Sequence, residues 1–302
     1  MNQSNCLICG SVSKEIMDHL DFTGSKVYYC ESCSYWFTCP MPNNRFLENY
    51  YDKNYRNDTS VFKTPEYYVT MKRRAHAQLN FIHRIAEVKV GYFKGKKAVD
   101  VGCGMGCLLK ALLQEGFNAE GFEYDSEIIQ YSEKKLKLKI NHGGFKAENY
   151  HDLDLITLSH VIEHLNDLNL YLNQYRNCLK KNTYLFIEVP NTVKKMFEEK
   201  VDQESHLHFF SKKSLSKILV QNGFEVLSCV ECGVPIEKAY NFTNEKEKVP
   251  FWKKCIYKGM KELKIDSLYC NKTIFDGYYE NYNFENGQSG QWLRCLSRKQ
   301  KD

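Results

Sequence analysis

The chain has 302 residues and a formal net charge of +5, because 42 Lys and Arg residues outnumber 37 Asp and Glu residues. This length allows a full hydrophobic core and about two domains, and so small a charge imbalance does not by itself indicate a nucleic-acid partner. The start lacks a basic segment followed by an apolar run, and no stretch approaches the ~20 apolar residues of a spanning helix. We therefore expect a soluble, cytoplasmic protein without a signal peptide or a transmembrane segment.

Two Cys-x-x-Cys pairs lie in the first 42 residues, at Cys6 and Cys9 and at Cys30 and Cys33. Each pair forms a tight knuckle with two thiolates on one side, and two knuckles at the ends of a hairpin close a tetrahedral sulfur site that suits Zn²⁺. We predict that residues 1–42 form a zinc ribbon with a structural metal, because four protein ligands leave no open coordination position. Unrelated thiols or two disulfides are the alternative, and a reducing compartment fits the cysteine placement better.

The predicted ribbon is small and acidic. A module of about 40 residues has too little core to fold alone, so the metal is expected to supply its folding free energy. It carries two lysines and four carboxylates, and four thiolates on one Zn²⁺ add further negative charge. This charge argues against a nucleic-acid partner and favours a structural role or a lid over a substrate.

An irregular aromatic connector is predicted at residues 43–69, with a short helix near 46–51. Residues 70–90 follow as an amphipathic helix, because apolar residues recur there at helical spacing. Lys72, Arg73 and Arg74 on this helix form either a solvated face or a contact with the carboxylate of a ligand.

A glycine-rich turn is the most informative feature of the chain. Residues 98–101 are an apolar run that predicts a buried strand, and a helical pattern of leucines begins at Leu108. Between them every second residue is a glycine, at Gly102, Gly104 and Gly106. Glycines there let the backbone approach a ligand closely, and the following helix directs unpaired N–H groups to the same point. The turn therefore predicts a nucleotide-like ligand.

A second strand, residues 118–123, ends in Glu123. A carboxylate at this position can accept hydrogen bonds from both hydroxyls of a ribose. The turn has the spacing G-x-G-x-G, whereas NAD-binding turns have G-x-G-x-x-G. An ordinary βα turn without a ligand is the alternative interpretation.

Histidines follow two later strands. The fourth strand, residues 152–159, is followed by His160, Glu163 and His164, and ligands of open α/β sheets bind at the carboxyl ends of the strands. The fifth strand, residues 184–189, precedes a second set of side chains: His206, His208 and Ser211, of which Ser211 is the predicted N-cap of the next helix.

The sixth and last strands are predicted at residues 224–232 and 291–297. The roughly 55 residues between them are too many for a bare loop, and part of that segment has a helical apolar stripe with lysines on its other faces. It is either a packed helix with a solvated basic face or a lid. The lid would meet an anionic acceptor or a membrane surface that holds a lipid-linked glycan.

With these motifs the chain resembles class I S-adenosylmethionine-dependent methyltransferases, in particular the group that includes the ubiquinone-pathway O-methyltransferases. The resemblance covers residues 70–232 and resumes near 290–297. It rests on Glu123 and on four sequence motifs: VDVGCGMG at 99–106, DLITLSHVIEH at 154–164, LKK at 179–181 and FIEVPN at 186–191. It implies an α/β, Rossmann-like sheet of seven strands with helices on both faces. This domain would span residues 70–302, with an insertion at about 234–289.

The resemblance also implies S-adenosyl-L-methionine as cofactor. The residues expected to bind it lie in the glycine turn and at the ends of the second and fourth strands: Asp100, Gly102, Cys103, Gly104, Gly106, Glu123, Tyr124, Ser159 and His160.

The catalytic residues are expected at the histidine motifs. A hydroxyl acceptor needs a base, for which a neutral histidine is suited, so His164, His160 and His206 are candidates with Glu163 beside them. In the ubiquinone-type relatives, two acids and a histidine at positions 160, 163 and 164 can bind a divalent cation. In this chain the first of these positions is His160 in place of an acid. The alternatives are that Glu163 and His164 cap the next helix and order the end of the strand, and that the pair at 206 and 208 packs against the sheet edge. The H-x-x-E-H protease signature does not apply, because it requires a helix.

The leading functional hypothesis is methylation, most plausibly of oxygen, on a small molecule, sugar or glycan, including a nucleotide-linked one. A zinc ribbon joined to this core resembles zinc-containing sugar methyltransferases. The chain is too short for the further C-terminal domain usual in the sugar C-methyltransferases. An RNA methyltransferase is the alternative, because ribosomal RNA guanine methyltransferases also combine a zinc module with this core. A non-catalytic scaffold is the third hypothesis, and neither the acceptor nor the oligomeric state follows from these motifs.

Overall fold

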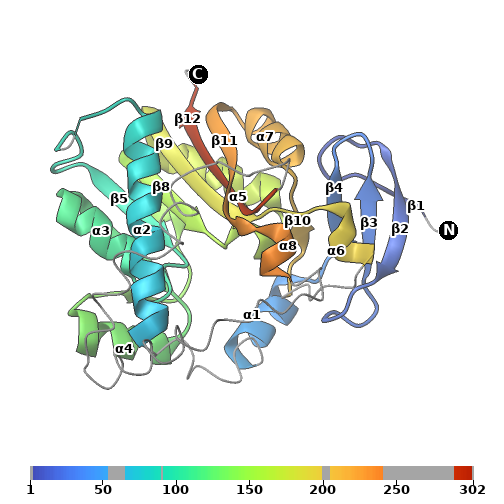
Figure 1. Cartoon of the computed structure of the whole chain (residues 1–302), viewed down its shortest axis with the longest axis horizontal. Coiled ribbons are helices and arrows are strands. Elements are labelled where there is room, and N and C mark those ends of the chain that lie inside the picture. The colour runs from blue at the N-terminus through green and yellow to red at the C-terminus, as the bar shows by residue number, and fades with distance from the viewer. Residues whose placement is uncertain (1–2, 54–64, 90, 199–204, 241–288, 301–302) are drawn as a thin grey trace, which may run out of the picture.

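The computed structural model describes residues 3–53, 65–89, 91–198, 205–240 and 289–300. Two β-sheets lie side by side, with the smaller N-terminal sheet on the right in Figure 1. The larger sheet has seven strands in the order β11-β12-β9-β8-β5-β6-β7. Its strands are β5 (Lys97–Val101), β6 (Asn118–Glu123), β7 (Asn141–His142), β8 (Leu153–Ser159), β9 (Leu179–Pro190), β11 (Phe224–Pro235) and β12 (Gly290–Lys299).

The five strands from β9 to β7 are parallel, whereas β11 and β12 form an antiparallel pair at one edge. This sheet confirms the predicted Rossmann-like class. The segment between β11 and β12, including the predicted lysine-rich helix, lies mostly outside the described residues.

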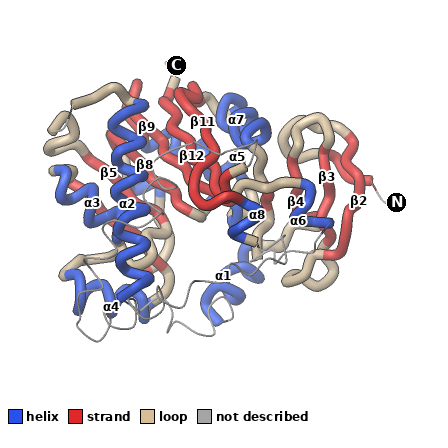
Figure 2. The backbone as a smooth tube through the Cα atoms, in the orientation of Figure 1, coloured by secondary structure: helices blue, strands red, loops and turns tan. Residues whose placement is uncertain are grey.

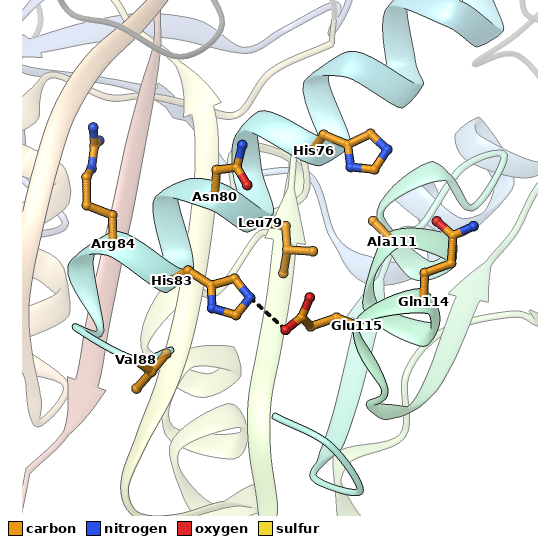
Figure 3. Close-up of a pocket in the computed structure, with 9 residues that line it drawn as sticks. All are labelled: His76, Leu79, Asn80, His83, Arg84, Val88, Ala111, Gln114 and Glu115. Atoms are coloured by element: carbon orange, nitrogen blue, oxygen red, sulfur yellow. Dashed lines mark ion pairs between the residues drawn. The ribbon is translucent and has the colours of Figure 1, made fainter. Parts of the chain in front are cut away.

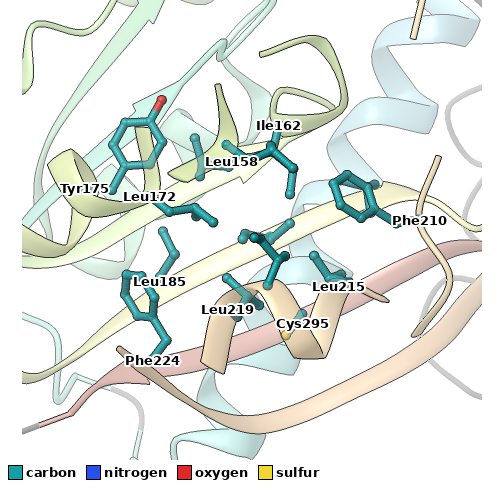
Figure 4. Close-up of a cluster of buried hydrophobic side chains, with 14 of the residues drawn as sticks. Leu158, Ile162, Leu172, Tyr175, Leu185, Phe210, Leu215, Leu219, Phe224 and Cys295 are labelled. Atoms are coloured by element: carbon teal, nitrogen blue, oxygen red, sulfur yellow. The ribbon is translucent and has the colours of Figure 1, made fainter. Parts of the chain in front are cut away.

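Helices cover both faces of the seven-stranded sheet. Figure 2 shows α2 lying across one face, where it packs with α3 against side chains such as Leu155 and Phe186. On the opposite face α5 and α7 pack against side chains such as Leu158 and Leu185, as Figure 4 shows. The longer helices are α2 (Pro65–Ile85), α3 (Cys107–Glu115), α4 (Ser126–Leu136), α5 (Leu168–Cys178) and α7 (Lys212–Gln221).

The helix predicted at residues 70–90 begins and ends earlier than expected. It begins at Pro65, since proline is well tolerated in the first turn of a helix, and its last residue is Ile85. Glu87 has φ of 55°, a left-handed conformation that cannot continue the helix. Shorter elements are α1 (Asn44–Lys53), α6 (Lys194–Glu198), α8 (Ile236–Ala239) and the 3-10 turns η2 (Ala147–Asn149) and η3 (Ile162–His164).

The N-terminal sheet is completed by a strand from far along the chain. Its order is β1-β2-β3-β4-β10, all antiparallel, and β10 pairs with β4 through His208–Phe37 and Phe209–Trp36. The ring of Tyr35 packs 5.8 Å from that of Phe210, so the two sheets share one hydrophobic core. Its strands are β1 (Gln3–Asn5), β2 (Val12–Asp18), β3 (Lys26–Cys30), β4 (Tyr35–Cys39) and β10 (His208–Phe209).

Among the described residues, the helices are all too short or too polar to cross a lipid bilayer.

Candidate active site

The glycine turn joins β5 to α3 at the carboxyl end of the parallel strands. Its glycines have φ of 64° at Gly102, 54° at Gly104 and 77° at Gly106, a region that other residues rarely adopt. A Cβ atom at Gly102 would lie 2.7 Å from Val161 Cγ2, and one at Gly106 would lie 2.8 Å from Leu138 Cδ1. At Gly104 a Cβ atom would meet no described atom within 4 Å. The backbone at Gly104 is therefore accessible to a ligand.

Glu123 connects the end of β6 to this turn. Its Oε2 accepts a hydrogen bond from the Gly104 N–H at 2.8 Å, and its Oε1 accepts from the N–H groups of Tyr124 and Asp125 at 2.8 and 3.0 Å. A carboxylate offers about four lone-pair sites, so acceptor capacity remains after these three bonds. The carboxylate thus lies beside the accessible backbone of Gly104, as a ribose-binding acid must.

The other predicted cofactor residues near the turn differ in exposure. Asp100 is buried, its Oδ1 accepts from Thr157 Oγ1 at 2.7 Å, and burial raises its pKa to about 7. Cys103 packs under β6, where its Sγ would lie 2.8 Å from a Cβ atom at Gly121. Tyr124 is exposed. Asp100 and Cys103 therefore support the turn from beneath, whereas Tyr124 faces solvent.

The predicted catalytic side chains come together where β8 ends. Glu163 and His164 lie in η3, and His160 Nδ1 is 3.2 Å from Glu163 Oε1. His206 comes from the segment before β10, and its ring centroid lies 4.9 Å from that of His164. One ligand atom each from Glu163, His164 and His206 lie within 4.8 Å of one another. We call these four residues the histidine cluster: His160, Glu163, His164 and His206.

Glu163 is the most buried member of the histidine cluster. It is fully buried, and its oxygens accept no hydrogen bond from the described residues. Burial opposes its ionisation, but the neighbouring imidazoles, His160 foremost, lower the pKa of Glu163 to about 2. Burial lowers the pKa of His206 to about 3. A buried carboxylate without hydrogen bonds requires a cation nearby, which an imidazolium or a divalent metal ion can provide.

His208 differs from His206 although they are only two residues apart. It is buried, its Nδ1 accepts from the Tyr35 hydroxyl, and its Nε2 donates to Leu165 O at 2.6 Å. Burial also lowers the pKa of His208 to about 4. With both ring nitrogens in hydrogen bonds, His208 is a structural residue, in line with the packing alternative for this pair.

The alternative for Glu163 and His164 is wrong only in its first part, the capping of the next helix, since Glu163 does lie 3.2 Å from His160 at the end of β8. The next helix, α5, is capped by Asp167, whose side chain accepts from the Leu170 N–H. Ser211 does cap α7, as predicted, in a reciprocal arrangement with Ser214.

A buried ion network beside the histidine cluster was missed by the sequence analysis. Glu188, near the end of β9, is fully buried and accepts from Arg74 Nε at 2.6 Å and from Arg294 Nε at 2.5 Å. Gln78 Nε2 donates both to Glu188 Oε1 and to Ser159 Oγ, at 2.8 and 3.0 Å. The network therefore fixes the last residue of β8.

The same network shows what the basic run at residues 72–74 contributes. Arg74 is an internal ion-pair partner whose guanidinium also lies 4.1 Å from the ring centroid of Trp292. The Glu188 carbonyl accepts from the His160 N–H at 2.8 Å. No local sequence pattern relates positions 74, 188 and 294, so only the fold could identify the network.

The four cysteines of the predicted ribbon converge at one end of the N-terminal sheet. Their sulfurs lie within 4.8 Å of one another, and Cys9 Sγ is 3.6 Å from Cys30 Sγ. Zinc–thiolate bonds of about 2.3 Å in a tetrahedral site place the sulfurs about 3.8 Å apart. The cluster therefore fits Zn²⁺ and consists of Cys6, Cys9, Cys30 and Cys33.

A surface pocket of about 460 Å³ lies between α2 and α3, as Figure 3 shows. An ion pair of 3.2 Å between His83 Nε2 and Glu115 Oε1 crosses it. Its lining residues include no member of the glycine turn or the histidine cluster, so we assign it no part in the chemistry of the site.

Comparison with known proteins agrees with this geometry. Residues 71–229 match the family described as methyltransferase domain. The ubiquinone biosynthesis O-methyltransferase of Pelagibacter ubique is 30% identical over 110 residues, which cover 34% of this chain and 46% of that protein. The enzyme of the same name from Haemophilus ducreyi is 26% identical over 138 residues, covering 38% and 57%. The chain thus matches about half the length of these relatives.

A solved structure has the same fold. Phosphoethanolamine N-methyltransferase 2 of Haemonchus contortus, in complex with S-adenosyl-L-methionine, superposes with a TM-score of 0.53 at 15% identity and covers 84% of this chain and 60% of that one. The fold is that of class I S-adenosylmethionine-dependent methyltransferases. The chain belongs to the methyltransferase domain family, whose match begins at residue 71, after the N-terminal cysteines.

Proposed function

We propose that this chain transfers the methyl group of S-adenosylmethionine to a hydroxyl group of a small molecule, sugar or glycan, including a nucleotide-linked sugar. The observation that carries the proposal is the proximity of the glycine turn and the histidine cluster. They follow β5 and β8, which are neighbours in the sheet. Val161, between His160 and Glu163, lies so close to Gly102 that a Cβ atom there would clash.

The residues around the accessible backbone of Gly104 fit the cofactor. Glu123 offers acceptors for the ribose hydroxyls, and Gly104 leaves the backbone beside it open to the ligand. When bound, S-adenosylmethionine supplies a methyl group on a sulfonium, which is transferred in line to the acceptor atom. The chain's own contribution is to align the acceptor, to exclude water and to hold a base.

His164 and His206 are the candidate bases. A neutral imidazole can accept the proton of the acceptor hydroxyl as the new bond forms. The adjacent carboxylate of Glu163 would then stabilise the imidazolium. The support for this assignment is the 4.9 Å separation of the two rings and the buried position of Glu163.

A second candidate mechanism uses a divalent cation bound by Glu163, His164 and His206. It is favoured by the carboxylate oxygens of Glu163, which accept no hydrogen bond from the described residues. One carboxylate and two imidazoles suit Mn²⁺ or Fe²⁺ better than Mg²⁺. This mechanism would be supported if a chelator abolishes activity and added Mn²⁺ restores it while the four-cysteine site stays zinc-loaded. Full activity in the presence of the chelator would exclude it.

The test of the function uses radiolabelled S-adenosylmethionine with three kinds of acceptor: 3,4-dihydroxybenzoate, dTDP-glucose and bulk tRNA. We expect label in a small hydroxylated acceptor and none in RNA. Label in tRNA alone would favour the RNA methyltransferase alternative, and the absence of cofactor binding would favour a scaffold.

The base is tested with His206→Gln and His164→Gln. One of them should lower kcat by about 10²–10⁴ while the Kd for the cofactor stays within about twofold. His151→Gln is the matched control, because His151 is exposed and belongs to neither the turn nor the cluster. Full activity in both cluster variants would discard the base assignment.

A further inference from the structure

The N-terminal sheet contacts the segment that carries His206. The loop between β2 and β3 reaches this segment, and β4 pairs with β10 immediately after it. Figure 1 shows β10 at the edge of the N-terminal sheet, on the side of the seven-stranded sheet. The sheet therefore lies where it can determine the position of a histidine-cluster residue.

His19, at the start of the β2–β3 loop, makes the first contact. It is buried, its Nε2 lies 2.8 Å from His206 O, and its Nδ1 lies 3.1 and 3.2 Å from the N–H groups of Asp21 and Phe22. A carbonyl only accepts and an N–H only donates, so the ring must be the neutral tautomer with its proton on Nε2. His19 therefore donates to the backbone of His206 while its own loop fixes its orientation.

Asp21 makes the second contact, one residue before His206. Its Oδ2 accepts from the Ser205 N–H at 2.7 Å, and the Ser205 hydroxyl lies 3.4 Å from the same oxygen. The Tyr50 hydroxyl of α1 also forms a hydrogen bond with Ser205 Oγ. Ser205 has φ of 61°, a conformation that costs free energy in a residue with a side chain and persists only where its surroundings hold it.

Backbone hydrogen bonds continue the connection to Glu163. The Thr38 N–H of β4 donates to Leu207 O at 2.9 Å, and the Leu207 N–H donates to Glu163 O at 2.8 Å. Residues 205–207 are thus held by the N-terminal sheet on one side and by η3 on the other.

We propose that His19 and Asp21 are positioning residues that hold His206 against Glu163 and His164, so that the N-terminal sheet forms part of the active site. The inference rests on the proposed function, in which His206 belongs to the catalytic machinery. It assigns the sheet a role in catalysis beyond that of a lid or a stabilising module.

The first experiment does not require an acceptor. Histidine-selective ¹⁵N NMR on the zinc-loaded 302-residue chain gives signals for His206 and His164, which His206→Gln and His164→Gln assign. His19→Leu removes the donor to His206 O and should shift both signals, whereas His19→Gln retains a donor and should keep them near their wild-type positions. Asp21→Ala and Asp21→Asn form a second pair with the same logic, since Asn keeps an acceptor for the Ser205 N–H.

The second experiment measures transfer to the acceptor found in the screen. His19→Leu should lower kcat by about 10- to 100-fold, as expected for a misplaced catalytic group. The KM for the cofactor should stay within about twofold, and His19→Gln should restore most of kcat. His151→Leu is the control for loss of a histidine elsewhere.

Three results would overturn the inference. Unchanged His206 and His164 signals in both His19→Leu and Asp21→Ala would show that the contacts do not position the ring. Equal losses in His19→Leu and His19→Gln would show a packing role, which does not need the donor. Wild-type kcat in both His19→Leu and Asp21→Ala would show that catalysis does not depend on these contacts. If His19→Leu fails to fold, as judged by zinc content and cooperative unfolding, the Asp21 pair decides. An inactive wild-type protein would refute the proposed function, while the NMR result would still decide the positioning.

Discussion

The two sides of the proposed site, one for the cofactor and one for the acceptor, are assembled in different ways. The glycine turn, Glu123 and the cap of α4 all come from residues 97–125, one continuous β5–α3–β6 unit. The histidine cluster comes from η3 and from the segment before β10, which the β2–β3 loop of the N-terminal sheet supports. The cofactor side thus depends on local backbone geometry, whereas the acceptor side depends on contacts between segments far apart in sequence.

This difference indicates that the two sides can be disturbed separately. The Glu123 carboxylate accepts from the N–H groups of Gly104, Tyr124 and Asp125, none of which belongs to the N-terminal sheet. His206 and His208, by contrast, are held by His19 and Tyr35 of that sheet. A family that keeps the cofactor unit while changing the supporting segments can therefore change its acceptor without losing its chemistry.

Loss of the zinc site should have the largest effect and should separate the two sides. In Cys33→Ser we expect the N-terminal sheet to lose its metal and much of its folding free energy. Methyl transfer should then fall more than about 100-fold, because the cluster is displaced, while the Kd for S-adenosylmethionine should change less than about fivefold. Transfer assays, calorimetry and zinc analysis on the same sample measure the three quantities.

Cys39→Ser is the matched control for this variant. Cys39 ends β4 in the same sheet and lies outside the four-cysteine cluster, so zinc content and transfer should remain near wild-type. Wild-type transfer in zinc-free Cys33→Ser would contradict the dependence of the acceptor side on the N-terminal sheet.

The second prediction concerns the pH dependence of stability. Burial lowers the pKa of His208 to about 4 in the folded chain, whereas an exposed histidine in the unfolded chain has a pKa near 6.5. The free energy of unfolding should therefore fall as the pH drops through this window, by up to about 3 kcal/mol in total and about 1 kcal/mol between pH 6.5 and 5.5. Urea denaturation at pH 7.5, 6.5 and 5.5 measures this change.

His208→Gln removes one of two buried rings with a lowered pKa and should reduce that slope, while the contribution of His206 remains; stability at pH 7.5 should fall. Identical slopes in the wild-type and the variant would show that the junction between β10 and β4 is not the source of the acid sensitivity.

Two helix caps allow the finest comparison. Asp125 caps α4 on the cofactor side, and Ser211 caps α7 on the acceptor side. Replacing either with Ala should lower the free energy of unfolding by about 1 kcal/mol, measured by chemical denaturation. Asp125→Ala should weaken cofactor binding slightly with kcat unchanged. Ser211→Ala should lower kcat slightly with the Kd for the cofactor unchanged. The same functional effect in both variants would mean that the two sides are not separable.

The sequence predicted the local geometry of the glycine turn and Glu123 more completely than the contacts that support the histidine cluster, for a physical reason. The turn from Gly102 to Gly106 and the acid at Glu123 are local patterns, and the order of parallel strands brings Glu163 to the same edge of the sheet. The pairing of a two-residue strand at His208 with β4 has no local signature. The same is true of the shared carboxylate of Glu188, because its partners come from α2 and β12.

Cofactor binding is the most direct test of the account as a whole. Calorimetric titration of the 302-residue chain with S-adenosylmethionine should show one site per chain, and NAD⁺ should give no heat. Glu123→Ala should lower the affinity for the cofactor about 10- to 100-fold, because hydrogen bonds to a charged group contribute about 1.5–3 kcal/mol. Binding of NAD⁺, or no binding of S-adenosylmethionine by the wild-type protein, would contradict the assignment of the glycine turn and with it the proposed function.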